Sequence, residues 1–82
     1  MYRIVLDEET DEQIDALPYE ALRPLAELLD VLSVAPWNGD PVNDAKPDAP
    51  LRSWLFGRAG LLTYLILDDQ HRVDLIRVVW VA

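Results

Sequence analysis

The side chains best suited to chemistry in this chain are three arginines and two groups that can carry a proton. Arg52, Arg58 and Arg77 lie in the C-terminal part of the sequence, and a guanidinium binds phosphate oxygens through paired hydrogen bonds. Around a phosphodiester, together with Tyr64, they could stabilise the charge that develops during RNA cleavage. Tyr64 or His71 could assist proton transfer. A plainer interpretation stays open, since arginines are common at sheet edges and His71 falls in a polar turn.

Other kinds of site find little support in the sequence. The absence of cysteine excludes disulfides and thiolate metal sites, and a single histidine cannot form a metal-binding pair. Gly57 and Gly60 bound a hairpin rather than a strand-to-helix phosphate loop. Asp68 and Asp69 could hold a hard cation, although a charged turn is the commoner use of such a pair. We therefore predict no metal and no cofactor.

Three consecutive strands are predicted to carry the arginines. They span Leu51–Phe56, residues 61–67 and residues 72–81, with polar four-residue turns between them. Their content of β-branched and aromatic residues is typical of strands, and connections this short pair neighbouring strands antiparallel. Residues 2–6 predict a further short strand at the start of the chain.

Two helices are predicted between the first strand and the other three. Thr10 and Gln13 match a capping box, so the first helix is expected to begin with Thr10 as its N-cap and to end near Leu17. Leucines and alanines spaced three and four apart predict a second helix over residues 23–34.

Residues 37–50 follow the second helix and are rich in proline, which predicts a loop. A loop of this length in a small domain is often functional. It could instead be a strap, with Trp37 and Val42 tucked against the core.

This order of elements predicts one domain, residues 1–82, of the α+β class. Two helices would pack on one face of a four-stranded, mainly antiparallel sheet. Side chains alternate between the faces of a strand, so Arg52, Trp54 and Phe56 should share one face, and Arg77 should lie on the same face as Val73 and Leu75.

Both faces of this predicted sheet are apolar, whereas an antiparallel sheet with one solvated face usually alternates apolar and polar residues. Two short helices can cover one face. The other face would expose an apolar surface, which usually marks a binding site for a partner. We predict such a site at Trp54, Phe56, Tyr64 and Trp80. The alternative is that the loop and the twist of the sheet cover this surface.

Composition narrows the possible partners. The chain has 82 residues and a net charge of −8, which argues against a general binder of polyanions. Residues 1–50 carry 12 acidic and 3 basic residues, whereas residues 51–82 carry 3 acidic and 4 basic ones. The sequence contains no apolar run long enough for a membrane span and no signal-peptide pattern, so we expect a cytoplasmic location and no membrane partner.

A family resemblance is spread over most of the chain. It is carried by YRIVL at residues 2–6, by Leu17 and Pro18 between the helices, and by the segment from Leu32 to Pro36. It continues in the strands as LRSWLFG at 51–57, LTYLI at 62–66 and VDLIRV at 73–78. In this pattern the chain resembles the RelE/ParE toxin superfamily of type II toxin–antitoxin systems.

The resemblance implies a small toxin that an antitoxin wraps and blocks. RelE-type members cut messenger RNA on the ribosome with basic residues on the sheet and a tyrosine or histidine, whereas ParE-type members poison DNA gyrase. Arg52 and Arg77 lie where the family places basic residues on two strands.

The chain also departs from the nuclease pattern. Leu61 and Leu62 stand where nucleases usually have an arginine, and Trp54 replaces a second basic residue. The sequence ends at Ala82, where nuclease members continue with a basic and aromatic tail. We predict a toxin-like component with an antitoxin-like partner, acting on ribosome-bound mRNA if it is an endoribonuclease. A non-catalytic interaction module, including a homodimer, and a gyrase inhibitor are the alternatives.

Overall fold

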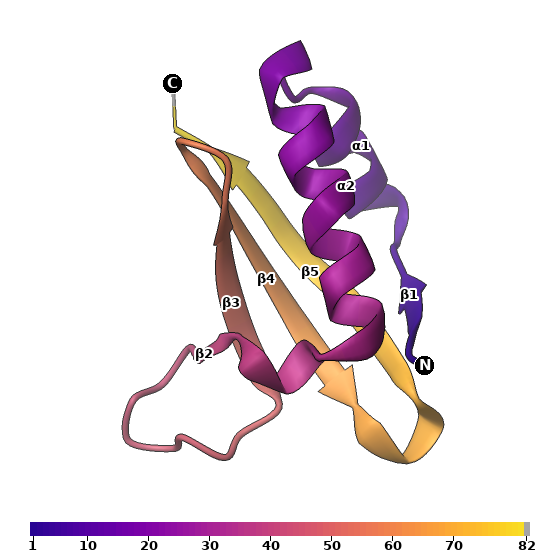
Figure 1. The fold of residues 1–82 in the computed structure, drawn as a ribbon, viewed down its shortest axis with the longest axis vertical. Helices are drawn as coiled ribbons and strands as arrows, with labels where there is room; N and C mark the ends of the chain where they lie inside the picture. Colours follow the sequence, from indigo (N-terminus) through magenta and orange to yellow (C-terminus); the bar gives the residue numbers. More distant parts are fainter. Residues whose placement is uncertain (82) are drawn as a thin grey trace.

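The computed structural model describes residues 1–81 and shows an α+β domain in which helices pack on a mixed β-sheet (Figure 1). The elements follow in the order β1 (Arg3–Val5), α1 (Glu8–Asp15), α2 (Tyr19–Val34), η1 (Pro36–Asn38), β2 (Asp40–Pro41), β3 (Leu51–Phe56), β4 (Gly60–Leu67), η2 (Asp68–Gln70) and β5 (Arg72–Trp80). The predicted class and the three C-terminal strands are confirmed.

The sheet has five strands rather than the predicted four, in the order β1-β5-β4-β3-β2. β3, β4 and β5 form an antiparallel meander, and β1 pairs in parallel with β5. The additional strand, β2, is two residues long and pairs antiparallel with β3. It was not predicted because Pro41 cannot donate a ladder hydrogen bond, and proline therefore argues against a strand except at an edge.

Helix α1 begins three residues earlier than the sequence predicted. Asp7 is its N-cap: the Asp7 carboxylate accepts a hydrogen bond from the Thr10 backbone N–H at 2.9 Å, and the Thr10 hydroxyl oxygen accepts one from the Asp7 N–H at 3.0 Å. Thr10 therefore closes the capping box from within the helix. Gln13 has another role, because its side-chain oxygen accepts a 2.7 Å hydrogen bond from the Val78 N–H of β5.

Helix α2 also begins earlier than predicted. It starts at Tyr19, with Pro18 as an extended N-cap residue, and it includes Pro24. Pro24 lacks an N–H, so α2 loses one backbone hydrogen bond there. The core contacts of the buried side of the helix outweigh that loss. The buried residues of that side are Ala21, Leu25, Leu28 and Leu32.

The core lies between α2 and one face of the sheet, while α1 lies beside β5. From the sheet it includes Phe56, Leu62, Tyr64, Ile66, Val73, Leu75 and Val78. Neither helix packs on the opposite side of the sheet, which we call the open face. Among residues 1–81, no helix combines the length and apolar character that crossing a membrane requires.

Candidate functional site

Arg52 lies on the helix-covered face and is only 7% exposed. Its guanidinium makes four hydrogen bonds, all donated to backbone carbonyl oxygens of residues 37–49. The acceptors are Ala49 at 3.3 Å, Trp37 at 3.4 Å, Gly39 at 2.8 Å and Pro47. It also lies 5.0 Å from the centroid of the Trp37 ring. The donors of Arg52 therefore hold residues 36–50 against the sheet, and its burial argues against the phosphate-binding role that the sequence predicted.

Tyr64 faces Arg52 across the β3–β4 ladder and is completely buried. Its hydroxyl donates a 2.6 Å hydrogen bond to the Pro36 carbonyl oxygen. Burial raises the pKa of Tyr64 to about 12, and the nearby Arg52 charge lowers it only in part. A buried phenol that holds its proton this firmly is poorly placed for the acid–base role that the sequence predicted for Tyr64.

Arg58 and His71 lie in turns at opposite ends of β4. Arg58 donates a 3.1 Å hydrogen bond from Nε to Glu20 and lies 5.4 Å from the Trp80 ring centroid. This bond lowers the pKa of the Glu20 carboxyl. His71 follows η2 in a left-handed conformation, with its ring 5.4 Å from that of Tyr2. An eight-residue strand spans about 25 Å, so these two side chains cannot act on one phosphate.

Arg77 is the predicted phosphate-binding residue that reaches the open face. β5 contains a bulge: Thr63 of β4 pairs with Arg77, but Tyr64 pairs with Leu75, which leaves Ile76 as the extra residue. A bulge of this kind re-aims the side chains that follow it. It moves Arg77 to the face opposite Leu75, which corrects the predicted alternation. The structure therefore brings Arg52 and Tyr64 together, but it places Arg77 on the opposite face and His71 in a turn.

The predicted partner surface also lies on the other side of the sheet. Phe56 is 4% exposed and Tyr64 is fully buried, while Trp54 and Trp80 are half-buried against the core. The Phe56 and Trp80 rings lie 6.0 Å apart under the helices. The expectation that these four residues form an open surface is wrong, because the helices cover the aromatic face.

Apart from Arg77, the open face is formed by side chains that were not assigned a role from the sequence. Leu55 is 74% exposed at its surface. The strand register places the following side chains together on this face: Leu51, Ser53 and Leu55 of β3; Leu61, Thr63, Leu65 and Leu67 of β4; Asp74, Arg77 and Val79 of β5. Such a largely apolar surface fits a protein segment better than a nucleic acid. The non-alternating pattern of residues 61–67 was the signal for this surface.

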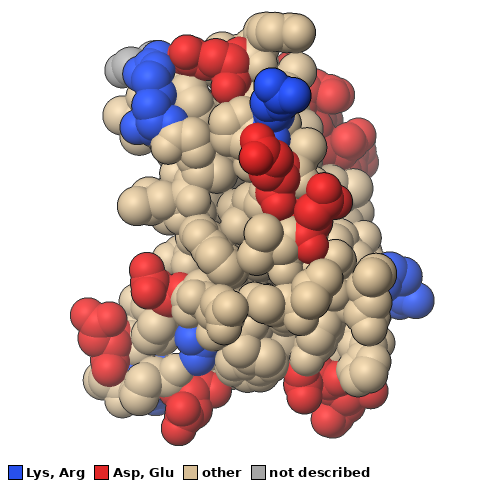
Figure 2. Space-filling model, viewed as in Figure 1, with Lys and Arg blue, Asp and Glu red and all other residues tan. Residues whose placement is uncertain are grey.

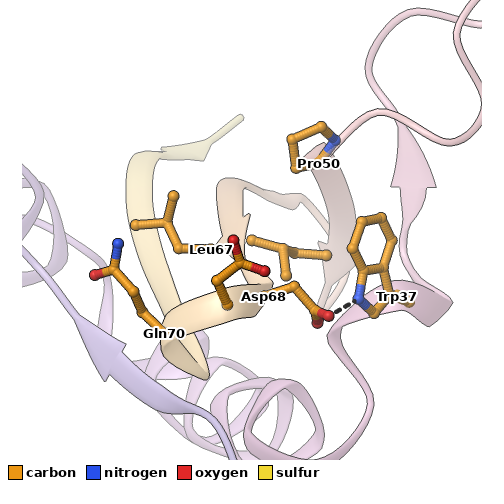
Figure 3. Close-up of a pocket in the computed structure, with 7 residues that line it drawn as sticks. Trp37, Pro50, Leu67, Asp68 and Gln70 are labelled. Atoms are coloured by element: carbon orange, nitrogen blue, oxygen red, sulfur yellow. Dashed lines mark hydrogen bonds between the residues drawn. The ribbon is translucent and has the colours of Figure 1, made fainter.

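A shallow hollow of about 310 Å³ lies at one end of the sheet (Figure 3). It is lined by Trp37, Pro50, Ile66, Leu67, Asp68, Asp69 and Gln70. The Asp68 carboxylate accepts hydrogen bonds from the Tyr2 hydroxyl and, at 3.1 Å, from Trp37 Nε1. These bonds lower the pKa of Asp68 and tie the N-terminus and residue 37 to the β4–β5 turn. Among residues 1–81, no cluster of three or more side chains suited to a metal ion is present.

The helix-bearing face offers no continuous basic surface. Acidic side chains are more widespread on it than basic ones, and the basic groups lie apart from one another (Figure 2). This distribution argues against RNA binding on that face.

Comparison with known proteins finds similarity in structure. No protein-family model matches the sequence, and no curated protein matches it. The crystal structure of the toxin–antitoxin complex RelBE2 from Mycobacterium tuberculosis is similar to this chain, with 24% identity and a TM-score of 0.73. The similarity covers 98% of this chain and 98% of the matched chain.

Two E. coli structures show the same likeness. The isolated E. coli RelE toxin matches all of this chain over 86% of its own, with 16% identity and a TM-score of 0.80. The match to the intact E. coli RelBE toxin–antitoxin complex covers all of this chain and 99% of the matched chain, with 18% identity and a TM-score of 0.76. The fold of this chain is therefore RelE-like, as the sequence resemblance predicted.

Proposed function

We propose that this protein is the toxin-like component of a type II toxin–antitoxin pair in the cytoplasm, and that it acts by binding an antitoxin-like partner across its open face. The observation that carries the proposal is this uncovered apolar face, formed by β3, β4 and β5 in a RelE-like fold. Two of the similar structures are themselves toxin–antitoxin complexes. An 82-residue domain also gains stability when a partner covers its apolar surface.

The geometry supports binding more strongly than ribonuclease chemistry. Arg52 and Tyr64 use their polar atoms on backbone carbonyls inside the fold. Arg77 alone cannot both position a phosphodiester and move a proton, since its guanidinium stays charged at all ordinary pH values. Chemistry on RNA would then depend on groups supplied by another molecule.

Binding can be tested with the products of the two genes that flank the gene for this protein. We expect one of them to form a stable complex that is visible by size-exclusion chromatography and titration calorimetry. Leu55→Lys, on the open face, should weaken that complex at least tenfold. Val34→Lys is a matched control, because Val34 is 69% exposed but lies at the end of α2. Failure of both flanking products to bind, or equal weakening by the two variants, would contradict the proposal.

Activity can be tested by expressing the protein alone in a bacterium and following growth and mRNA integrity. We expect intact mRNA. If mRNA is cleaved and Arg77→Ala prevents this, the protein is an endoribonuclease, and the binding-only mechanism is wrong. A DNA-damage response with intact mRNA would instead support gyrase inhibition.

A further inference from the structure

A polar row crosses the middle of the open face. The register pairs Arg77 with Thr63, and Thr63 with Ser53, so these three side chains lie side by side on β5, β4 and β3. Apolar side chains lie on both sides of this row. One side has Leu55, Leu61 and Val79, and the other has Leu51 and Leu65.

Arg77 is the charged end of this row and has no ion pair in residues 1–81. The nearest acid on the same face of β5 is Asp74, but its carboxylate is bound by Arg72 at 2.8 Å. Asp40, which pairs with Ser53, is three strands from Arg77. At about 4.8 Å per strand this separation is roughly 14 Å, which is too far for an ion pair.

Covering the open face would remove Arg77 from water. A charge buried without a counter-charge is strongly unfavourable, whereas a hydrogen-bonded carboxylate compensates for the lost hydration. A partner that covers Arg77 together with the leucines is therefore favoured if it brings an acidic side chain to the β5 end of this row. The hydroxyls of Thr63 and Ser53 can accept or donate hydrogen bonds to polar groups beside that carboxylate.

We infer that the segment of the antitoxin-like partner that docks here carries an aspartate or glutamate opposite Arg77, with apolar side chains on both sides of it. This inference rests on the proposed function, because it specifies the chemistry of the partner at the same face. Arg77 thus selects the partner, while the leucines supply the buried area.

The test selects 16-residue peptides from a random display library on the immobilised full chain, with separate selections on wild type and on Arg77→Glu. Binders are retained only if Leu55→Lys weakens them and Val34→Lys does not. We expect wild type to select peptides with one acidic residue among apolar ones, and Arg77→Glu to select lysine or arginine at that position. Arg77→Glu should weaken the wild-type peptides at least tenfold.

Arg23→Glu is the control for net charge, because Arg23 is exposed on α2 and the substitution changes the charge by the same amount. It should leave the affinity unchanged. If wild type and Arg77→Glu select the same open-face peptides, the inference is wrong, although the proposed function survives. If no selected peptide depends on Leu55, both are wrong. A homodimer that Leu55→Lys dissociates would make a second copy the occupant and would overturn the inference.

Discussion

Arg52 and Arg77 carry the same guanidinium on the same sheet, and their surroundings give them opposite roles. Arg52 lies under the helices on β3, where four carbonyl oxygens of the residue 36–50 segment receive its donors. Arg77 lies on the open face of β5, exposed and without an ion pair in the described part of the chain. The position of an arginine on a strand does not reveal its role, since its neighbours decide whether its donors are available.

The region around Arg52 is a structural unit in its own right. Tyr64 and Arg52 together bind the carbonyl oxygens of Pro36, Trp37 and Gly39, which fixes the start of the long loop. Arg52 and Tyr64, which the sequence suggested as catalytic groups, thus hold a loop that covers the edge of the sheet. The region around Arg77 has the opposite character, because no ion pair within residues 1–81 uses its guanidinium.

Arg52→Ala should have the largest effect on stability. It removes four hydrogen bonds from a charged donor to carbonyl oxygens, and we expect the free energy of unfolding to fall by about 3 kcal/mol. Urea denaturation measures this loss, and hydrogen exchange should show faster exchange in residues 36–50. Arg52→Lys should recover little, because one ammonium cannot reach acceptors arranged around a planar fork. A loss below about 1 kcal/mol would show that Arg52 does not anchor the loop.

Gly39→Ala should have the next largest effect. A Cβ at this position would lie 2.0 Å from the Tyr64 hydroxyl oxygen and 3.1 Å from the Ser53 carbonyl oxygen. We expect a loss of about 2 kcal/mol, because the buried ring cannot move aside without disturbing the core. The same substitution in a Tyr64→Phe background should cost about half as much, since the closest atom is gone. Equal costs in both backgrounds, measured by urea denaturation, would refute this contact.

Tyr64→Phe should have a moderate effect that depends on pH. At neutral pH it removes one buried hydrogen bond and should cost about 1 kcal/mol. The pKa of Tyr64 is about 12 in the folded protein and about 10 when unfolded. The protonated phenol therefore favours the folded state, and its contribution is complete below pH 10 and is lost as the pH rises towards 12.

Urea denaturation between pH 9 and 11 tests this dependence. Above pH 10, the unfolding free energy of wild type should fall relative to that of Tyr64→Phe by about 1.4 kcal/mol per pH unit. The other tyrosines are present in both proteins, so their titration cancels in the difference. Parallel profiles would mean that Tyr64 is not buried as a neutral phenol.

Much of the fold could be predicted from local sequence patterns. The strand Leu51–Phe56 was predicted to the residue, because its leucines and aromatic side chains end abruptly at Gly57 and Arg58. The start of α2 was predicted too late, because Pro24 suggested that the helix begins near it. The burial of Ala21 and Leu25 favours helix on both sides of the proline. Tertiary packing overrode a local preference there.

The site was less predictable, for two physical reasons. Alternation shows that both faces of a strand are apolar, but it does not show which face the helices will cover, so the aromatic face with Trp54 and Trp80 was taken for the open one. The bulge at Ile76 shifts the alternation by one residue, and nothing in the sequence of β5 marks it. The face of Arg77 depends on that shift.

Arg77→Ala should have the smallest effect on stability, and it completes the comparison with Arg52. No ion pair within residues 1–81 holds its side chain, so the unfolding free energy should change by less than about 0.5 kcal/mol. Arg72→Ala on the same strand is a useful reference, because it breaks the half-buried pair with Asp74 and should cost up to about 1 kcal/mol. A loss from Arg77→Ala larger than that from Arg72→Ala would mean that the fold uses Arg77 internally. In that case its charge would already be compensated, and a docking partner would have no need to supply a carboxylate.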